Sequence, residues 1–124
     1  MGIELLIQKI KSHPKYAQAG MILCHNGVVR RTSRDGRDVT GLSVQVDHEK
    51  LQLILNARKK DPGIIEILVE INADQNLSVG DDVMFLVVAG DIRENVLATM
   101  EKMLNAIKTT VTRKTEFFKS APIG

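Results

Sequence analysis

The chain has 124 residues, of which 44% are hydrophobic and 26% are charged, values that are typical of a globular protein with an ordinary apolar core. A single cysteine, Cys24, excludes both an internal disulfide framework and a cysteine-rich zinc site. The formal net charge of +2, with one tyrosine, three phenylalanines and no tryptophan, argues against a nucleic-acid surface of stacking rings on a basic patch.

The first part of the chain predicts a helix followed by two strands. Residues 3–12 carry apolar side chains at i, i+3, i+4 and i+7, which is the spacing of one helix face. The apolar stretch over residues 20–30 predicts a strand, and the alternating residues 42–48 predict a second, half-buried one. Between them, residues 31–41 contain an Asp-Gly pair that favours a turn, so we expect a hairpin with a solvated, arginine-rich tip.

The middle of the chain predicts a helix and two more strands. Asp47 is placed to cap a helix over residues 48–60. Residues 64–71 predict a strand, and residues 72–82 a long turn. The continuous apolar run over residues 82–90 is typical of a central strand that is covered on both faces.

The last predicted element is an amphipathic helix. Asp91 and Glu94, three positions apart, form an acidic variant of the capping box at its start. Its apolar residues follow at helical spacing: Val96, Leu97, Met100, Met103, Leu104 and Ile107. Lys108 lies four residues after Leu104 and eleven after Leu97, so at about 100° per residue it is expected on the buried stripe.

These elements predict an α+β fold, with a mainly antiparallel sheet covered by helices. No repeat, linker or low-complexity segment appears, so we expect a single domain over residues 1–124. No apolar run reaches the roughly 18 residues that cross a bilayer, and the N-terminal residues do not form a secretory signal. We therefore expect a cytoplasmic protein without membrane association.

The candidate functional residues are basic. Lys108 has two interpretations. In the first, its aliphatic stem covers apolar surface and its charge interacts favourably with the negative end of the helix dipole. In the second, it is held in a half-buried pocket, where it serves in acid–base chemistry or binds an anion. Arg30 follows directly on a strand, where its guanidinium can be fixed to face a phosphate or carboxylate. Arg93, in the first turn of the last helix, is either an anion-binding residue or an exposed residue without a functional role.

Other residue types carry less chemistry. The three histidines are scattered and lack ligand spacing, so we expect no metal site and no cofactor. Arg31, Arg34 and Arg37 are expected to be solvated at the hairpin tip, and Arg34 and Arg37 to be replaceable.

Four stretches together resemble the large, catalytic subunit of molybdopterin synthase. They are the strand end "GVVR" at 27–30, the turn "LSVGDDV" at 77–83, the helix start "DIRENVLATM" at 91–100, and "IKTTVTRKTEF" at 107–117. The likeness covers about residues 3 to 118.

The resemblance implies an α/β hammerhead-like domain with additional antiparallel strands, assembled as a homodimer. In the family, two lysines line a pocket that accepts the Gly-Gly C-terminus of a small ubiquitin-like sulfur-carrier subunit. Sulfur passes from the thiocarboxylate of that tail to a cyclic pyranopterin phosphate, in molybdenum cofactor biosynthesis. The resemblance assigns the lysine roles to Lys108 and Lys114, with Arg113 as an alternative to the second. It assigns anion binding to Arg30 and Arg93.

One departure from the family pattern bears on activity. The histidine of the family's histidine–arginine pair falls on Ile92. The sequence is therefore compatible with a second hypothesis, a non-catalytic relative that binds the carrier tail or an anionic ligand. A third hypothesis, a small nucleic-acid-binding domain that uses the arginine-rich tip, is disfavoured by the low charge and few aromatic residues.

Overall fold

The structure, a computed structural model, describes residues 2–120 and contains three helices and six strands within that range. The elements are α1 (Ile3–Lys11), β1 (Met21–Val28), β2 (Val39–Val46), α2 (His48–Arg58), β3 (Ile64–Ile71), β4 (Leu77–Ser78), β5 (Asp82–Gly90), α3 (Arg93–Ala106) and β6 (Thr112–Phe118). A short 3₁₀ turn, Tyr16–Gln18, precedes β1, and a π-helical turn, Ile107–Val111, joins α3 to β6.

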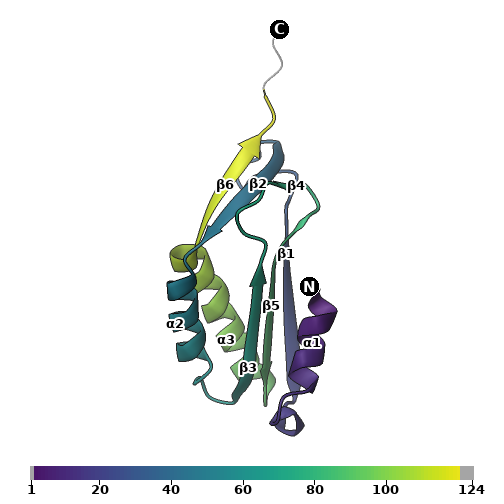
Figure 1. Ribbon diagram of the computed structural model, residues 1–124, viewed down its shortest axis with the longest axis vertical. Helices are drawn as coiled ribbons and strands as arrows, with labels where there is room; N and C mark the ends of the chain where they lie inside the picture. The colour runs from purple at the N-terminus through teal and green to yellow at the C-terminus, as the bar shows by residue number, and fades with distance from the viewer. Residues whose placement is uncertain (1, 121–124) are drawn as a thin grey trace.

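The strands form two separate three-stranded antiparallel sheets. The larger has the order β1-β5-β3, and the smaller has the order β4-β2-β6. Figure 1 shows α2 and α3 on one side of the larger sheet and α1 on the other, with β2 and β6 extending beyond it toward the C-terminal end. The predicted α+β class with antiparallel sheets is confirmed.

Strand β5 is the centre of the larger sheet, and both of its faces are buried, as its apolar run predicts. Leu86 and Val88 belong to the core under α3, whereas Val87 and Ala89 belong to the core under α1. All four side chains are 0% exposed. Successive residues of a strand point to opposite faces, so a strand covered on both sides is apolar at every position.

The smaller sheet has its own core. Leu42 and Val44 on β2 pack with Val29, just after β1, and with Leu77 on β4. Val29 is tied to the β4–β5 turn from both of its backbone groups: its N–H donates to the Asp81 carbonyl at 2.9 Å, and its carbonyl accepts from the Gly80 N–H at 2.9 Å. The end of β1 is thus fixed against the smaller sheet.

The two predicted helix starts have different outcomes. The Asp47 cap is confirmed, because its carboxylate accepts from the Lys50 N–H at 3.0 Å. The capping box at α3 is wrong, since the N-cap position is held by Ile92, which has no polar side chain. Asp91 instead accepts from the Asn95 side chain at 2.9 Å and from the Ile92 N–H, and these hydrogen bonds lower the pKa of its carboxyl.

The predicted hairpin between residues 20–30 and 42–48 is also wrong, because β1 and β2 belong to different sheets. Within the intervening loop, an isolated bridge joins Thr32 to Asp38. Strand β6 is not among the predicted elements, which end with the last helix. Its sequence, TRKTEFF, lacks the apolar alternation of a half-buried strand.

Two glycines with positive φ allow a matched test of the fold. At Gly63 (φ 72°), an added Cβ would lie 2.0 Å from Asp91 Oδ1, whereas at Gly36 (φ 86°) it would meet nothing within 4 Å. Gly36→Ala should therefore cost only the backbone strain, about 1–2 kcal/mol. Gly63→Ala should lower the free energy of unfolding by clearly more, because the Asp91–Asn95 contact must also move. Urea unfolding measures both, and equal losses would contradict the packing at Gly63.

Candidate functional site

Two of the predicted residues, Arg30 and Lys114, line the same cavity. It has a volume of about 690 Å³ and lies between the end of β1, the loop over residues 31–38 and strand β6. The other lining residues come from the same segments and from β2: Val28, Thr32, Ser33, Arg34, Gly36, Leu42 and Glu116. We call this the arginine cavity.

The pairing of β6 with β2 brings Lys114 to the arginine cavity. Lys114 lies opposite Val44, and Glu116 lies opposite Leu42. Since alternate residues share a face of a strand, Lys114 and Glu116 project on the side of the sheet that carries these apolar β2 residues. That side faces the end of β1, and Arg30 lies two residues beyond this strand end.

Arg30 is held in position although it is exposed. It follows the buried Val29, which is 2% exposed. Its Nε donates to the Thr32 carbonyl at 2.7 Å, which fixes the plane of the guanidinium. The predicted fixed arginine at the strand end is therefore confirmed in its geometry.

The charge of the arginine cavity is positive. Three lining cations, Arg30, Arg34 and Lys114, face one carboxylate, that of Glu116. Lys114 Nζ lies 3.8 Å from Glu116 Oε1, with the two side chains 53% and 25% exposed. An ion pair this exposed contributes little to stability, so an anionic ligand can compete for the lysine at small cost.

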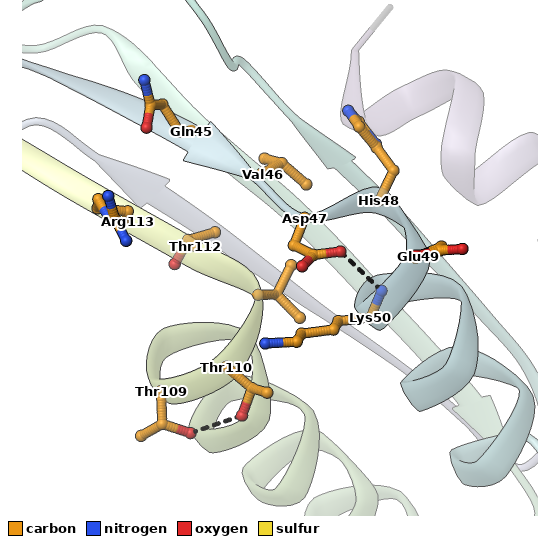
Figure 2. A pocket seen from close by; sticks show the side chains of 11 residues that line it. Gln45, Val46, Asp47, His48, Glu49, Lys50, Thr109, Thr110, Thr112 and Arg113 are labelled. Carbon is orange, nitrogen blue, oxygen red and sulfur yellow. Dashed lines mark hydrogen bonds between the residues drawn. The ribbon is translucent and has the colours of Figure 1, made fainter.

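Arg113 lines a different cavity. Adjacent residues of β6 point to opposite faces, and Arg113 lies with the start of α2 and the π-helical turn around a space of about 820 Å³. Figure 2 shows Lys50 extending from α2 toward the turn that carries Thr109 and Thr110. Asp47 and Glu49 also line this space and balance Lys50 and Arg113, so it does not concentrate positive charge. Arg113 therefore does not share a site with Arg30.

The predicted position of Lys108 on the buried stripe is wrong, because the side chain is exposed. The buried side of α3 and the following turn is formed by Val96, Met100, Met103 and Ile107. Leu97, which served as a reference for the stripe, is 47% exposed. Lys108 lies on the π-helical turn, one residue after the buried Ile107, and lines neither cavity described above.

Arg93 is not brought to either cavity. Arg93 is the first residue of α3, whereas Lys108 lies beyond the other end of the helix, on the π-helical turn. The 14 residues of α3, at 1.5 Å per residue, separate the two ends by about 20 Å. Arg93 is 74% exposed and lies 3.7 Å from Glu94, and Ile92 beside it is 52% exposed.

Two features of the loop over residues 31–38 were not predicted from the sequence. Arg34 lines the arginine cavity, and Arg37 stacks on Phe118, with 3.8 Å between the guanidinium carbon and the ring centroid. Both arginines are exposed, as predicted, and Arg37 in addition contacts an aromatic ring. The contact depends on β6, which the sequence pattern did not reveal.

Neither metal binding nor membrane spanning is visible in the described part of the chain. Within residues 2–120, no three histidine, cysteine, aspartate or glutamate side chains gather as metal ligands would. No helix in the same range has the length and apolarity needed to cross a bilayer.

Burial raises the pKa of the Cys24 thiol, which disfavours the reactive thiolate.

Comparison with known proteins identifies relatives of this fold. The model of the family described as MoaE protein matches residues 3–110. A search of curated protein sequences gives no significant match. The similar solved structures include the following three. Molybdopterin synthase from Staphylococcus aureus is 21% identical, with a TM-score of 0.71 and coverage of 84% of this chain and 78% of that one. Molybdopterin cofactor biosynthesis protein E from Burkholderia multivorans is 16% identical, with a TM-score of 0.73 and coverage of 97% and 87%.

The third structure is a complex of subunits 1 and 2 of molybdopterin-converting factor from Helicobacter pylori. It is 15% identical, with a TM-score of 0.70 and coverage of 97% of this chain and 85% of that one. At these identities the structural likeness establishes the fold, and the family model, which spans most of the chain, establishes the family. The chain belongs to the MoaE family, the large subunits of molybdopterin synthase, which act in molybdenum cofactor biosynthesis.

Proposed function

We propose that this chain transfers sulfur from the C-terminal thiocarboxylate of a small ubiquitin-like subunit to a pterin phosphate, and that the arginine cavity is where it does so. The observation that carries the proposal is the meeting of Arg30 and Lys114, from opposite ends of the chain, in one positively charged cavity. Both substrates are anions, so a site for the reaction must concentrate cations. The cavity around Arg113 has balanced charge and does not meet this requirement.

The partner is supported by a relative. The Helicobacter pylori structure is a complex of two subunits of molybdopterin-converting factor, and this chain covers 85% of the matched chain. We infer that this protein also binds a small subunit, whose Gly-Gly tail enters the arginine cavity. A Gly-Gly tail has no side chains and so can follow a narrow path to a recessed cation.

The residues divide the chemistry by charge and shape. Arg30 offers a planar fork that suits phosphate, whereas the Lys114 ammonium is a compact charge that suits the thiocarboxylate. In the transfer, the thiocarboxylate sulfur attacks a pterin carbon and displaces an oxygen substituent from it. Water then hydrolyses the resulting thioester, so that the tail leaves as a carboxylate and the sulfur stays on the pterin as a thiolate. A protonated lysine can give a proton to the departing group. We propose that Lys108, exposed beside the start of β6, acts on the tail as it enters.

The site can be tested with single substitutions in a single-turnover assay of dithiolene formation with a thiocarboxylated small subunit. Arg30→Ala and Lys114→Ala should each lower the rate about 10²- to 10³-fold, because each removes a cation that faces developing negative charge. Lys108→Ala should lower the rate as well, because it removes the cation that is proposed to act on the entering tail. All three side chains are exposed, so thermal unfolding should change little. Arg113→Ala, on the opposite face of β6, is the matched control and should change the rate less than about threefold.

The outcomes separate the hypotheses. A loss at Arg113 that exceeds the loss at Lys114 would contradict the assignment of the arginine cavity. Tight binding of the small subunit with no product in the unmodified protein would identify a non-catalytic relative. The replacement of the family histidine by Ile92, the N-cap residue of α3, is the feature that favours this alternative, although Ile92 does not line the arginine cavity.

We further propose that the protein is a homodimer. Arg93 does not line the arginine cavity of its own chain, so it can serve an anion there only if a second copy supplies it. Sedimentation equilibrium at micromolar concentration should give twice the 13.7 kDa chain mass. A monomer at every concentration would rule out both the dimer and the proposed role of Arg93 in this site.

A further inference from the structure

The loop over residues 31–38 is an ordered turn with Arg34 at its apex. The Gly36 N–H donates to the Ser33 carbonyl at 3.0 Å, which closes a four-residue turn with Arg34 and Asp35 as its central residues. The Ser33 N–H donates to the Arg37 carbonyl at 2.9 Å, and Ser33 is 7% exposed. The Ser33 hydroxyl also donates to the Asp35 carboxylate, which lowers the pKa of that group.

This turn is fastened to β6, the strand that carries Lys114. The Arg37 guanidinium lies over the Phe118 ring and also donates to the Asp35 carboxylate at 3.0 Å. One residue beyond β6, the Lys119 N–H donates to the Asp38 carbonyl at 3.0 Å. The loop and the strand therefore hold the two walls of the arginine cavity in a fixed relation.

Arg34 is the one cation lining the cavity that makes neither a hydrogen bond nor an ion pair among the described residues. Arg30 uses its Nε on the Thr32 carbonyl, and Lys114 is paired with Glu116. Within residues 2–120, Arg34 has no hydrogen bond or ion pair, yet its side chain lines the cavity. A cation that is aimed into a cavity without a protein partner is available to a ligand.

We propose that Arg34 is a specificity residue, which binds the substrate phosphate together with Arg30, while Lys114 receives the single charge of the partner's tail. This inference rests on the proposed function and adds the division of labour within its site. Two guanidinium forks match the charge and the several oxygens of a phosphate dianion. The lysine, already half-neutralised by Glu116, matches a monoanionic carboxylate better.

The test is an NMR titration of the full chain with two probes, inorganic phosphate at about pH 8 and a synthetic peptide that ends in Gly-Gly. Arg34→Ala should raise the Kd for phosphate about tenfold, as expected for the loss of one charge-assisted contact, and should leave the Kd for the peptide within about twofold. Arg31→Ala removes the same charge from the same loop, but Arg31 does not line the cavity, so this control should leave both constants unchanged.

A second substitution tests the fastening of the loop. Phe118→Leu removes the ring beneath Arg37 and should raise the Kd for phosphate about two- to fivefold while sparing the peptide. An unchanged constant would overturn the claim that this contact positions Arg34.

The remaining outcomes separate this inference from the proposed function. If Arg30→Ala weakens phosphate binding but Arg34→Ala matches the Arg31→Ala control, the inference is wrong and the proposed function stands. If Arg34→Ala weakens the peptide as much as the phosphate, the assignment of Arg34 to phosphate is wrong. If even Arg30→Ala leaves both probes unaffected, the arginine cavity is not the site and the proposed function itself fails.

Discussion

The antiparallel register between β2 and β6 determines which cations of this protein meet. It runs from Val39 opposite Phe118 to Val46 opposite Thr112. Because side chains alternate along a strand, a slip of one residue would turn Lys114 to the opposite face of the sheet and point Arg113 toward Arg30. The register is fixed from the inside by the apolar face of β2, where Leu42 and Val44 are buried. The packing of these aliphatic residues thus determines that Lys114, and not Arg113, faces the arginine cavity.

The π-helical turn at Ile107–Val111 determines where strand β6 begins. It changes the direction of the chain between α3 and β6 while keeping Ile107 and Val111 buried, at 3% exposure each. The wider turn carries Lys108 outward, away from the core side of α3. Such turns often occur at functional sites. Here the turn places an exposed lysine at the start of the strand that leads to Lys114, which gives the proposed path of the tail two basic positions.

The sequence predicts the elements whose apolar pattern is strong. Strand β5 reads as buried on both faces because every residue from Leu86 to Ala89 is apolar, and the Asp47 cap follows from local chemistry alone. Strand β6 could not be predicted from its pattern. It is polar because much of it faces solvent, and it forms because of its long-range partner β2. Everything that depends on β6 was therefore inaccessible as well, including the contact of Arg37 with Phe118.

The candidate site follows the same division. Arg30 was identified from its place after a strand, and its fixed guanidinium bears out that reasoning. Lys114 came only from the family resemblance, since nothing local indicates that it faces Arg30. Arg34 was assigned to solvent, because an Asp-Gly turn in isolation gives no sign of what lies beside it. Lys108 was misplaced because counting at 100° per residue assumed that Leu97 marks the buried side of the helix.

The most direct test of this account is a crystal structure of the protein bound to a small subunit with a Gly-Gly C-terminus. The account predicts that the terminal carboxylate lies within hydrogen-bonding distance of Lys114 Nζ, about 3 Å, in the cavity that Arg30 and Arg34 also line. A tail seated instead against Arg113, Thr109 and Lys50 would contradict it, because the tail would then occupy the opposite face of β6.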